Sequence, residues 1–174
     1  MRIGLIDTTA TSIDDLVDRV RTARDDGFAA FWMAQIFGLD ALTALAVAGR
    51  EVDGITLGTA VVPTFPRHPM MLAQQALTAN AACGGRFVLG IGLSHQVVIE
   101  NMLGLSFDKP FRHMREYLSV LAPLIREKNV AFAGDTYSVT GTVDIDAGPL
   151  PIVLAALGPK MLHLAGTMGD GTVT

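Results

Sequence analysis

A histidine follows an apolar run and two closely spaced glycines in the segment 84–95, which reads GGRFVLGIGLSH. The run indicates a β-strand, and in a parallel α/β fold the carboxyl ends of the strands carry the chemistry. Glycine lets a ligand approach the backbone closely, and the imidazole of His95 can exchange a proton near neutral pH. A flat ring or a phosphate could therefore lie against residues 90–95. A tight turn between strand and helix, with small residues serving packing, explains the pattern equally well.

Polar residues near other predicted strand ends are weaker candidates. Arg67 could bind a phosphate or carboxylate of a ligand, but pairing with a carboxylate of the protein is the favoured interpretation. Asp7 follows the first strand, where an acid that caps a loop is favoured over a substrate contact. Ser94 and the backbone N–H groups of residues 92–95 could hold an anion.

Several other kinds of site have no support in the sequence. The four histidines and the single cysteine show no spacing typical of metal ligands, so no metal site is expected. The segment 90–95 lacks the third glycine of a dinucleotide-binding fingerprint, and no Walker A lysine motif is present. Cys83 has no evident cationic partner, which predicts a small packing residue and not a nucleophile.

Composition limits the class of protein further. The chain has 174 residues, half of them apolar, which is enough for one buried core. A net charge of −4 argues against a nucleic-acid-binding surface. No apolar run approaches the roughly 20 residues of a membrane helix, and no signal-peptide core is evident. A lone cysteine fits a reducing environment, so a cytoplasmic location is expected.

Strand-like and helix-like runs alternate along the chain. A predicted N-cap at Ser12, with Asp15 three residues on, begins the first helix. Asp40 is expected to cap the second helix and Gly49 to end it, and Pro69 suits the first position of the third. Pro123 is expected to kink or divide the fourth. The predicted strands are 2–6, 29–34, 55–61, 87–91, 151–155 and 171–174. The predicted helices are 13–26, 41–48, 70–82, 111–128 and 159–168. A β-hairpin insertion is expected within 130–146.

Repeated strand-plus-helix units of this kind imply a parallel sheet with right-handed crossovers. A doubly wound sheet and a (β/α)8 barrel both fit the alternation. With five to six strands a barrel would be incomplete, and its open edges would need another segment or another chain to cover them. A homodimer is therefore expected.

Two motifs in order are distinctive: GTAVVPTFPRHP at 58–69 and GGRFVLGIG at 84–92. Together they resemble the bacterial luciferase-like monooxygenase superfamily, in its branch of coenzyme F420-dependent oxidoreductases. Further landmarks of that family match at 27–32, 155–159 and 169–171. The resemblance implies a luciferase-like (β/α)8 barrel, of which residues 1–174 would be the amino-terminal two-thirds as a single domain.

The resemblance also implies a cofactor, coenzyme F420 or alternatively FMN, lying over the carboxyl ends of the strands. A cis peptide between Ala60 and Val61 would form a bulge behind its ring, and His95 would be the catalytic acid or base. The residues expected to contact the cofactor are Ala60, Val61, Gly92, Ser94, His95, Gly158 and Pro159.

Sugar-phosphate dehydrogenases of this branch end their second strand with an acid and a catalytic histidine, where this chain has Gln35 and Ile36. Neither side chain can act as a general base, so that activity is disfavoured and the acid–base role falls to His95 or is lost. The resemblance implies hydride transfer between C5 of the deazaflavin ring and a small organic substrate. An FMN-dependent monooxygenase and a non-catalytic flavin-binding protein are the alternatives.

Overall fold

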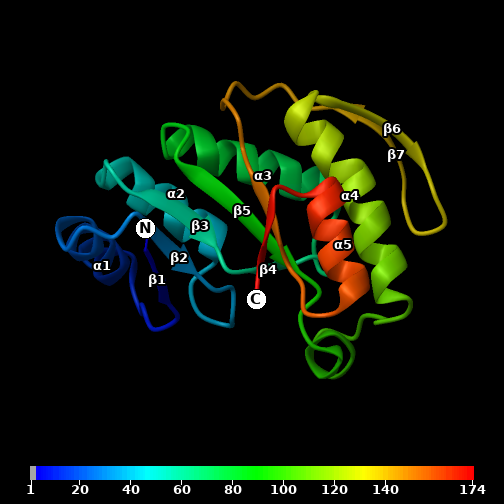
Figure 1. The fold of residues 1–174 in the computed structure, drawn as a ribbon, viewed down its shortest axis with the longest axis horizontal. Helices are drawn as coiled ribbons and strands as arrows, with labels where there is room; N and C mark the ends of the chain where they lie inside the picture. Colours follow the sequence, from blue (N-terminus) through cyan, green and yellow to red (C-terminus); the bar gives the residue numbers. More distant parts are fainter. Residues whose placement is uncertain (1–2) are drawn as a thin grey trace.

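The computed structural model of the protein describes residues 3–174, in which strands and helices alternate (Figure 1). The strands are β1 (Gly4–Asp7), β2 (Ala30–Met33), β3 (Thr56–Thr59), β4 (Val62–Pro63), β5 (Phe87–Gly92), β6 (Asn129–Ala133), β7 (Ser138–Thr142), β8 (Ile152–Ala155) and β9 (Gly171–Val173). The helices are α1 (Ile13–Asp25), α2 (Ala41–Glu51), α3 (Pro69–Ala82), the π-helix η1 (Val98–Met102), α4 (Pro110–Arg126) and α5 (Pro159–Met168).

The main sheet has the strand order β1-β2-β3-β5-β8-β9, and every neighbouring pair along it is parallel. The short β4 lies off this path and pairs with β5. A doubly wound sheet reverses its strand order at a switch point, whereas this order follows the chain throughout, as in a (β/α)8 barrel. The chain therefore forms an incomplete barrel, with β1 and β9 at the two edges of the described sheet.

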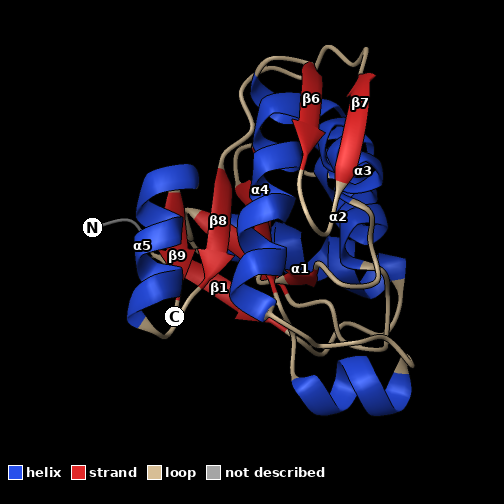
Figure 2. Ribbon diagram, turned by 90° about the vertical axis from the view of Figure 1, so that its right-hand side faces the viewer, coloured by secondary structure: helices blue, strands red, loops and turns tan. Residues whose placement is uncertain are grey.

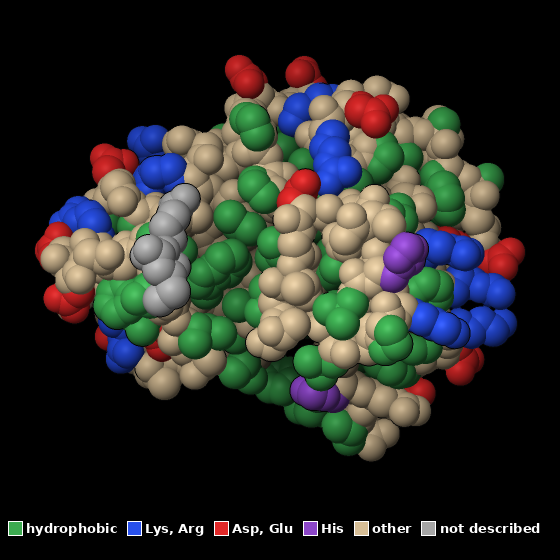
Figure 3. All heavy atoms as spheres, viewed as in Figure 1, with side chains coloured by type: hydrophobic (Ala, Val, Ile, Leu, Met, Phe, Trp, Pro, Cys, Tyr) green, Lys and Arg blue, Asp and Glu red, His purple; other side chains and the backbone are tan. Residues whose placement is uncertain are grey.

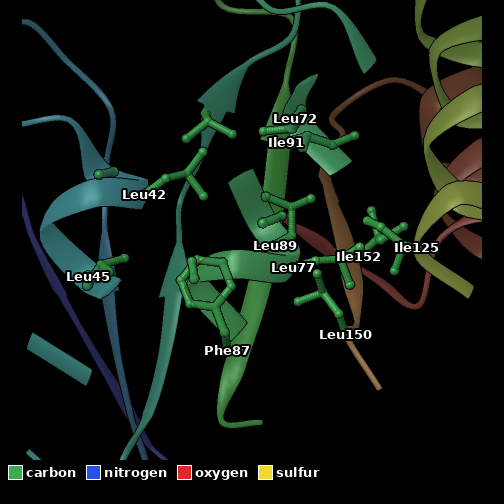
Figure 4. Packing of buried hydrophobic residues seen from close by; sticks show 14 of the residues in the cluster. Leu42, Leu45, Leu72, Leu77, Phe87, Leu89, Ile91, Ile125, Leu150 and Ile152 are labelled. Atoms are coloured by element: carbon green, nitrogen blue, oxygen red, sulfur yellow. The ribbon is translucent and has the colours of Figure 1, made fainter. Parts of the chain in front are cut away.

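Helices pack against one face of this sheet and enclose the core (Figures 1 and 2). Phe31, Leu57 and Phe87 occupy one row across β2, β3 and β5, and all three are fully buried. Figure 4 shows leucine side chains of α2 and α3, among them Leu45 and Leu77, around the aromatic ring of Phe87. Burial of this apolar row against the helices is what holds the strands in register.

The opposite face of the sheet carries apolar side chains that the described chain does not cover. Ile6, Trp32, Gly58 and Val88 form one row across the first strands, and Ile6 is 58% exposed. Gly58 leaves room for the indole ring of Trp32, because a Cβ at Gly58 would lie 2.4 Å from that ring. Figure 3 shows hydrophobic side chains exposed on this side, between the two ends of the chain.

Several local signals in the sequence are confirmed. Ser12 Oγ accepts a hydrogen bond from the backbone N–H of Asp15 at 3.1 Å, which caps α1. Asp40 caps α2 in the same way, through the N–H of Thr43 at 3.0 Å. Pro69 is the first residue of α3, where its missing N–H costs no helical hydrogen bond.

Pro123 does not divide the fourth helix, so that part of the prediction is wrong. α4 runs unbroken from Pro110 to Arg126, and the N–H of Glu127 still bonds to the carbonyl oxygen of Pro123 at 2.7 Å. Proline removes one backbone donor, but the buried face of the helix, which includes Leu121 and Ile125, offsets that loss through packing.

Gly49 does not end the second helix, which continues to Glu51. The glycine lies instead where α2 crosses the end of α3. A Cβ at this position would lie 2.3 Å from Sγ and 3.1 Å from Cα of Cys83, which is itself fully buried. Glycine is thus required here for the close approach of two helices.

Replacing Gly49 with alanine is expected to lower the free energy of unfolding by about 1–3 kcal/mol, because the added methyl overpacks the helix crossing. Urea denaturation of the variant measures the loss. The same substitution made in a Cys83→Ala background should lose less, since the sulfur atom nearest to the new methyl is gone. Equal losses in the two backgrounds would show that crowding against Cys83 is not the cause.

The hairpin insertion is confirmed as the antiparallel pair β6 and β7, which lies beside α4 (Figure 2). Its turn is held by Glu116 of α4, whose carboxylate accepts hydrogen bonds from the N–H groups of Asp135, Thr136 and Tyr137 at 3.3, 2.7 and 3.2 Å. Burial opposes ionisation of Glu116, but these donors outweigh it and lower its pKa. The insertion is therefore fixed to the barrel by a buried charge.

In residues 3–174, no helix has the length and hydrophobicity needed to cross a membrane.

Candidate active site

Backbone hydrogen bonds join the carboxyl ends of β2, β3 and β5. The N–H of Ala60 bonds to the carbonyl of Met33 at 2.9 Å, and the N–H of Gln35 bonds to the carbonyl of Val61 at 3.4 Å. Between these contacts the peptide bond from Ala60 to Val61 is cis, as the family resemblance implies. It interrupts the third predicted strand, so that residues 55–61 divide into β3 and a bulge that leads to β4.

Thr59 and Gly90 hold this bulge against β5. The hydroxyl of Thr59 donates to the carbonyl of Gly90 at 2.8 Å and accepts from its N–H at 2.9 Å. A Cβ at Gly90 would lie 1.9 Å from the backbone oxygen of Thr59. The side chain of Thr59 therefore replaces the usual strand ladder, and only glycine fits opposite it.

A pocket of about 360 Å³ opens at these strand ends. It brings together four of the predicted site residues: Ala60 and Val61 from the bulge, and Ser94 and His95 from the loop after β5. Its other lining residues are Ala34, Gln35, Ile36, Phe37, Pro63, Val98 and Leu103. In Figure 3 hydrophobic side chains surround a histidine along the lower edge of the molecule.

Three other predicted contact residues lie away from the lining of this pocket. Gly92 lies behind the bulge, where a Cβ would come within 2.6 Å of Val61 Cγ2 and 3.1 Å of Ala155 Cβ. The absence of a side chain at Gly92 thus leaves room for the side chain of Val61. Gly158 and Pro159 begin α5 at the end of β8 and are exposed.

Few polar groups are available to a ligand in the pocket, because nearby polar side chains already bond to other parts of the protein. Gln35 Oε1 accepts from the N–H of Ala41 at 2.8 Å and so caps α2. Arg67 pairs with Asp40 at 2.7 Å, as the favoured interpretation predicts. Ser94 has a φ of 65°, a left-handed conformation that is uncommon for serine.

His95 completes the polar side of the pocket. Its side chain is exposed. Its carbonyl accepts hydrogen bonds from the N–H groups of Val98 and Ile99, the first two residues of η1. The backbone of His95 is thereby fixed while its imidazole faces the pocket and solvent. Ser94 and His95 are therefore the side chains in this pocket that can exchange or share a proton with a ligand.

A buried histidine supports the bulge from outside. Thr64, whose N–H bonds to the carbonyl of Gly92 at 2.9 Å, has its hydroxyl 3.0 Å from Nε2 of His113. The ring of Phe65 stacks on His113 with centroids 3.9 Å apart. Burial lowers the pKa of His113 to about 4, against the opposing charge of Glu116. This neutral histidine holds the chain that leads from the bulge to α3.

The shift at His113 predicts a pH dependence of stability. The ordinary pKa is 6.5 and the folded value about 4, so the unfolded chain binds more protons in this interval and the free energy of unfolding rises with pH across it. Replacing His113 with glutamine, which can still donate to Thr64, should remove on the order of 1–2 kcal/mol of the rise between about pH 5 and about pH 7. Urea denaturation at the two pH values measures it. An unchanged rise in the variant would assign the pH dependence to other groups.

Two residues outside the pocket behave as predicted. Burial raises the pKa of the Cys83 thiol to about 11, against the opposing charge of Arg86, so the thiol is a packing group. Asp7 Oδ1 accepts from the N–H of Thr9 at 2.7 Å and thus caps its loop. Within residues 3–174, no cluster of three or more potential ligands for a metal ion is found.

The sequence interpretation missed the apolar wall of the pocket. Phe37, Val98 and Leu103 lie on irregular loops or on η1, and hydrophobic periodicity does not place such segments. One signal was available: Ile36 and Phe37 are two large apolar residues that follow a predicted strand after a single residue, at the end where ligands bind.

The partial barrel, its strand-end pocket and the bulge between β3 and β4 define a class of protein. The family model for luciferase-like monooxygenases matches residues 1–174, and the chain belongs to this family.

Three known proteins are similar to the chain in sequence or in fold. The chain is 34% identical to 5,10-methylenetetrahydromethanopterin reductase of Archaeoglobus fulgidus, over 88% of this chain and 47% of the relative. It is 35% identical to F420-dependent glucose-6-phosphate dehydrogenase of Intrasporangium calvum, over 76% and 42%. The oxygenating constituent of 3,6-diketocamphane monooxygenase of Pseudomonas putida, solved in complex with FMN, has a TM-score of 0.80 at 14% identity, over 100% and 57%. The chain spans about half the length of the curated relatives it matches.

Proposed function

We propose that the protein is a coenzyme F420-dependent oxidoreductase that acts on a small organic substrate. One observation carries the proposal: Ala60, Val61, Ser94 and His95 converge on one pocket at the carboxyl ends of the parallel strands. The F420-dependent relative from Intrasporangium calvum supports the choice of cofactor. The proposal takes residues 1–174 as the amino-terminal part of one barrel, and a cytoplasmic homodimer remains its expected state.

The residues present fit a flat aromatic ring. The bulge offers small or apolar groups, Ala60, Val61 and Pro63, and the pocket volume lies within the usual range for ligand sites. Coenzyme F420, when bound, supplies the ring carbon that accepts or donates hydride. The backbone contacts of Ala60 with Met33 and of Val61 with Gln35 keep the wall of the pocket rigid, so one face of the ring would be covered.

His95 would carry the proton. When a hydride leaves a carbinol carbon, the hydroxyl on that same carbon must lose its proton, and the two losses together are a two-electron oxidation to a carbonyl. The imidazole of His95 accepts this proton in oxidation and returns it in reduction. Ser94 would orient the same substrate oxygen by hydrogen bonding.

A substitution that fills the pocket tests the assignment. Ala60→Leu places a branched side chain on the wall where the ring would lie, and it should weaken coenzyme F420 binding at least about tenfold, since steric overlap removes the contact surface. Fluorescence titration measures the dissociation constant. Ala131→Leu, on the exposed side of the hairpin, is the matched control and should bind as the wild type does. If Ala60→Leu folds and binds coenzyme F420 normally, the ring does not lie in this pocket.

FMN is the alternative cofactor, favoured by the likeness of the fold to a structure solved with FMN. Coenzyme F420 carries a long anionic tail, whereas FMN needs a compact site for its phosphate. A protein that binds a flavin without turnover would share the binding behaviour but not the proton transfer by His95. Parallel titrations and the His95 substitutions described in the Discussion separate the three possibilities.

A further inference from the structure

Large hydrophobic side chains gather at the mouth of the pocket. Ile36 and Phe37, in the loop after β2, are 55% and 65% exposed, and Leu103, after η1, is 40% exposed. All three line the pocket together with Val98. Single exposed apolar residues are ordinary, but a group of them around one concavity marks a binding surface.

This wall carries no charge that could balance an anionic ligand. Of residues 3–174, none that lines the pocket is Lys, Arg, Asp or Glu. Arg67, in the loop that follows β4, is paired with Asp40 at 2.7 Å. The Oε1 atom of Gln35 accepts from the start of α2. A phosphate or carboxylate placed against Phe37, Val98 and Leu103 would lose hydration without gaining a cationic partner from the described lining, which is unfavourable.

We propose that this wall selects an uncharged substrate with an apolar group next to the reacting carbon, such as a ketone or secondary alcohol with an aliphatic chain. The inference rests on the proposed function and goes beyond it by naming the substrate class. The apolar group lies against Phe37, Val98 and Leu103, while the oxygen faces Ser94 and His95. Phe37 and Leu103 are then specificity residues that act in binding and not in proton transfer.

Equilibrium binding to the cofactor-loaded protein tests the substrate class. Butan-2-one, hexan-2-one and octan-2-one are compared by isothermal titration calorimetry with the 2-oxo acids of the same chain lengths. Each added methylene should tighten ketone binding by up to about fourfold, as expected for transfer to an apolar surface. At each length the 2-oxo acid should bind at least about tenfold more weakly, because no lysine or arginine of the described lining balances its carboxylate.

Variants locate the effect on the wall. Phe37→Ser and Leu103→Ser should each reduce the gain in affinity per methylene and raise KM more than they lower kcat. Val97→Ser is the matched control, because Val97 is 59% exposed beside the same segment but does not line the pocket. It should keep the wild-type gain. Ketone affinity independent of chain length, tighter binding of the 2-oxo acids, or an equal loss in Val97→Ser would each overturn the proposal.

The readout separates this inference from the proposed function. Coenzyme F420 binding is measured on the same samples by fluorescence, and the ketone series is also titrated without cofactor. Normal coenzyme F420 binding with no dependence on ketone chain length rejects the substrate class alone. Absent coenzyme F420 binding with a clear dependence on chain length rejects the proposed cofactor and supports the apolar wall.

Discussion

Replacing His95 with alanine is expected to lower kcat/KM by about 10²–10⁴-fold, the usual contribution of a general acid or base. Histidine is the residue type in the described lining that most often serves as a general acid or base, and the N–H groups of Val98 and Ile99 fix the backbone of His95. Affinity for coenzyme F420 should change little, because Ala60 and Val61 form the wall for the ring. Steady-state kinetics with a substrate found among the ketones or secondary alcohols measures the loss.

His95→Gln refines this test. Glutamine keeps hydrogen-bonding capacity but cannot exchange a proton, so its loss should match that of alanine. His163→Ala is the control, since His163 lies exposed on α5 and outside the pocket. Full activity in His95→Gln would reduce the role of His95 to hydrogen bonding. Full activity in both His95 variants would remove it from catalysis.

Gly90→Ala should cause the largest loss of stability of any single methyl addition in the sheet. The added carbon would lie 1.9 Å from the backbone oxygen of Thr59, and neither strand can yield without breaking the two hydrogen bonds of the Thr59 hydroxyl. A loss of at least about 3 kcal/mol is expected from overpacking and broken buried hydrogen bonds together. Thermal and urea unfolding measure it.

The matched control is Gly166→Ala in α5, where an added Cβ meets no atom within 4 Å. Alanine stabilises an exposed helical position by about 0.5–1 kcal/mol relative to glycine, so this variant should be neutral or more stable. If Gly90→Ala unfolds with the wild-type free energy, the bulge is more adaptable than its hydrogen bonds indicate. Its pocket would then not be a rigid platform for a ring.

The sequence predicted those parts of the molecule that depend on local signals. Ser12 and Asp40 were identified as helix caps because each is a residue type that favours the N-cap and stands directly before a helical run. His95 was placed at the site because it follows a predicted strand, and the carboxyl ends of parallel strands meet at one edge. Ala60 and Val61 were placed there by the family resemblance. Residue type and spacing are sufficient for the caps and for His95, but not for Ala60 and Val61.

The parts that failed depend on contacts between distant segments. Gly49 has the same local pattern as a helix terminator, and only the position of Cys83 shows that it serves a helix crossing. Gln35 was recognised as unable to act as a base, but its role as a cap for α2 depends on the loop between them. Phe37 and Leu103 meet at one pocket because two irregular loops fold toward each other, and no periodic pattern records that.

The most direct measurement of the central claim is a fluorescence titration of the protein with coenzyme F420, with FMN titrated in parallel under the same conditions. We expect saturable binding of coenzyme F420 with a dissociation constant at least about tenfold below that for FMN, and loss of that preference in Ala60→Leu but not in Ala131→Leu. Tighter binding of FMN would assign the pocket to a flavin. Binding of neither cofactor would contradict the proposal that this pocket holds a redox ring.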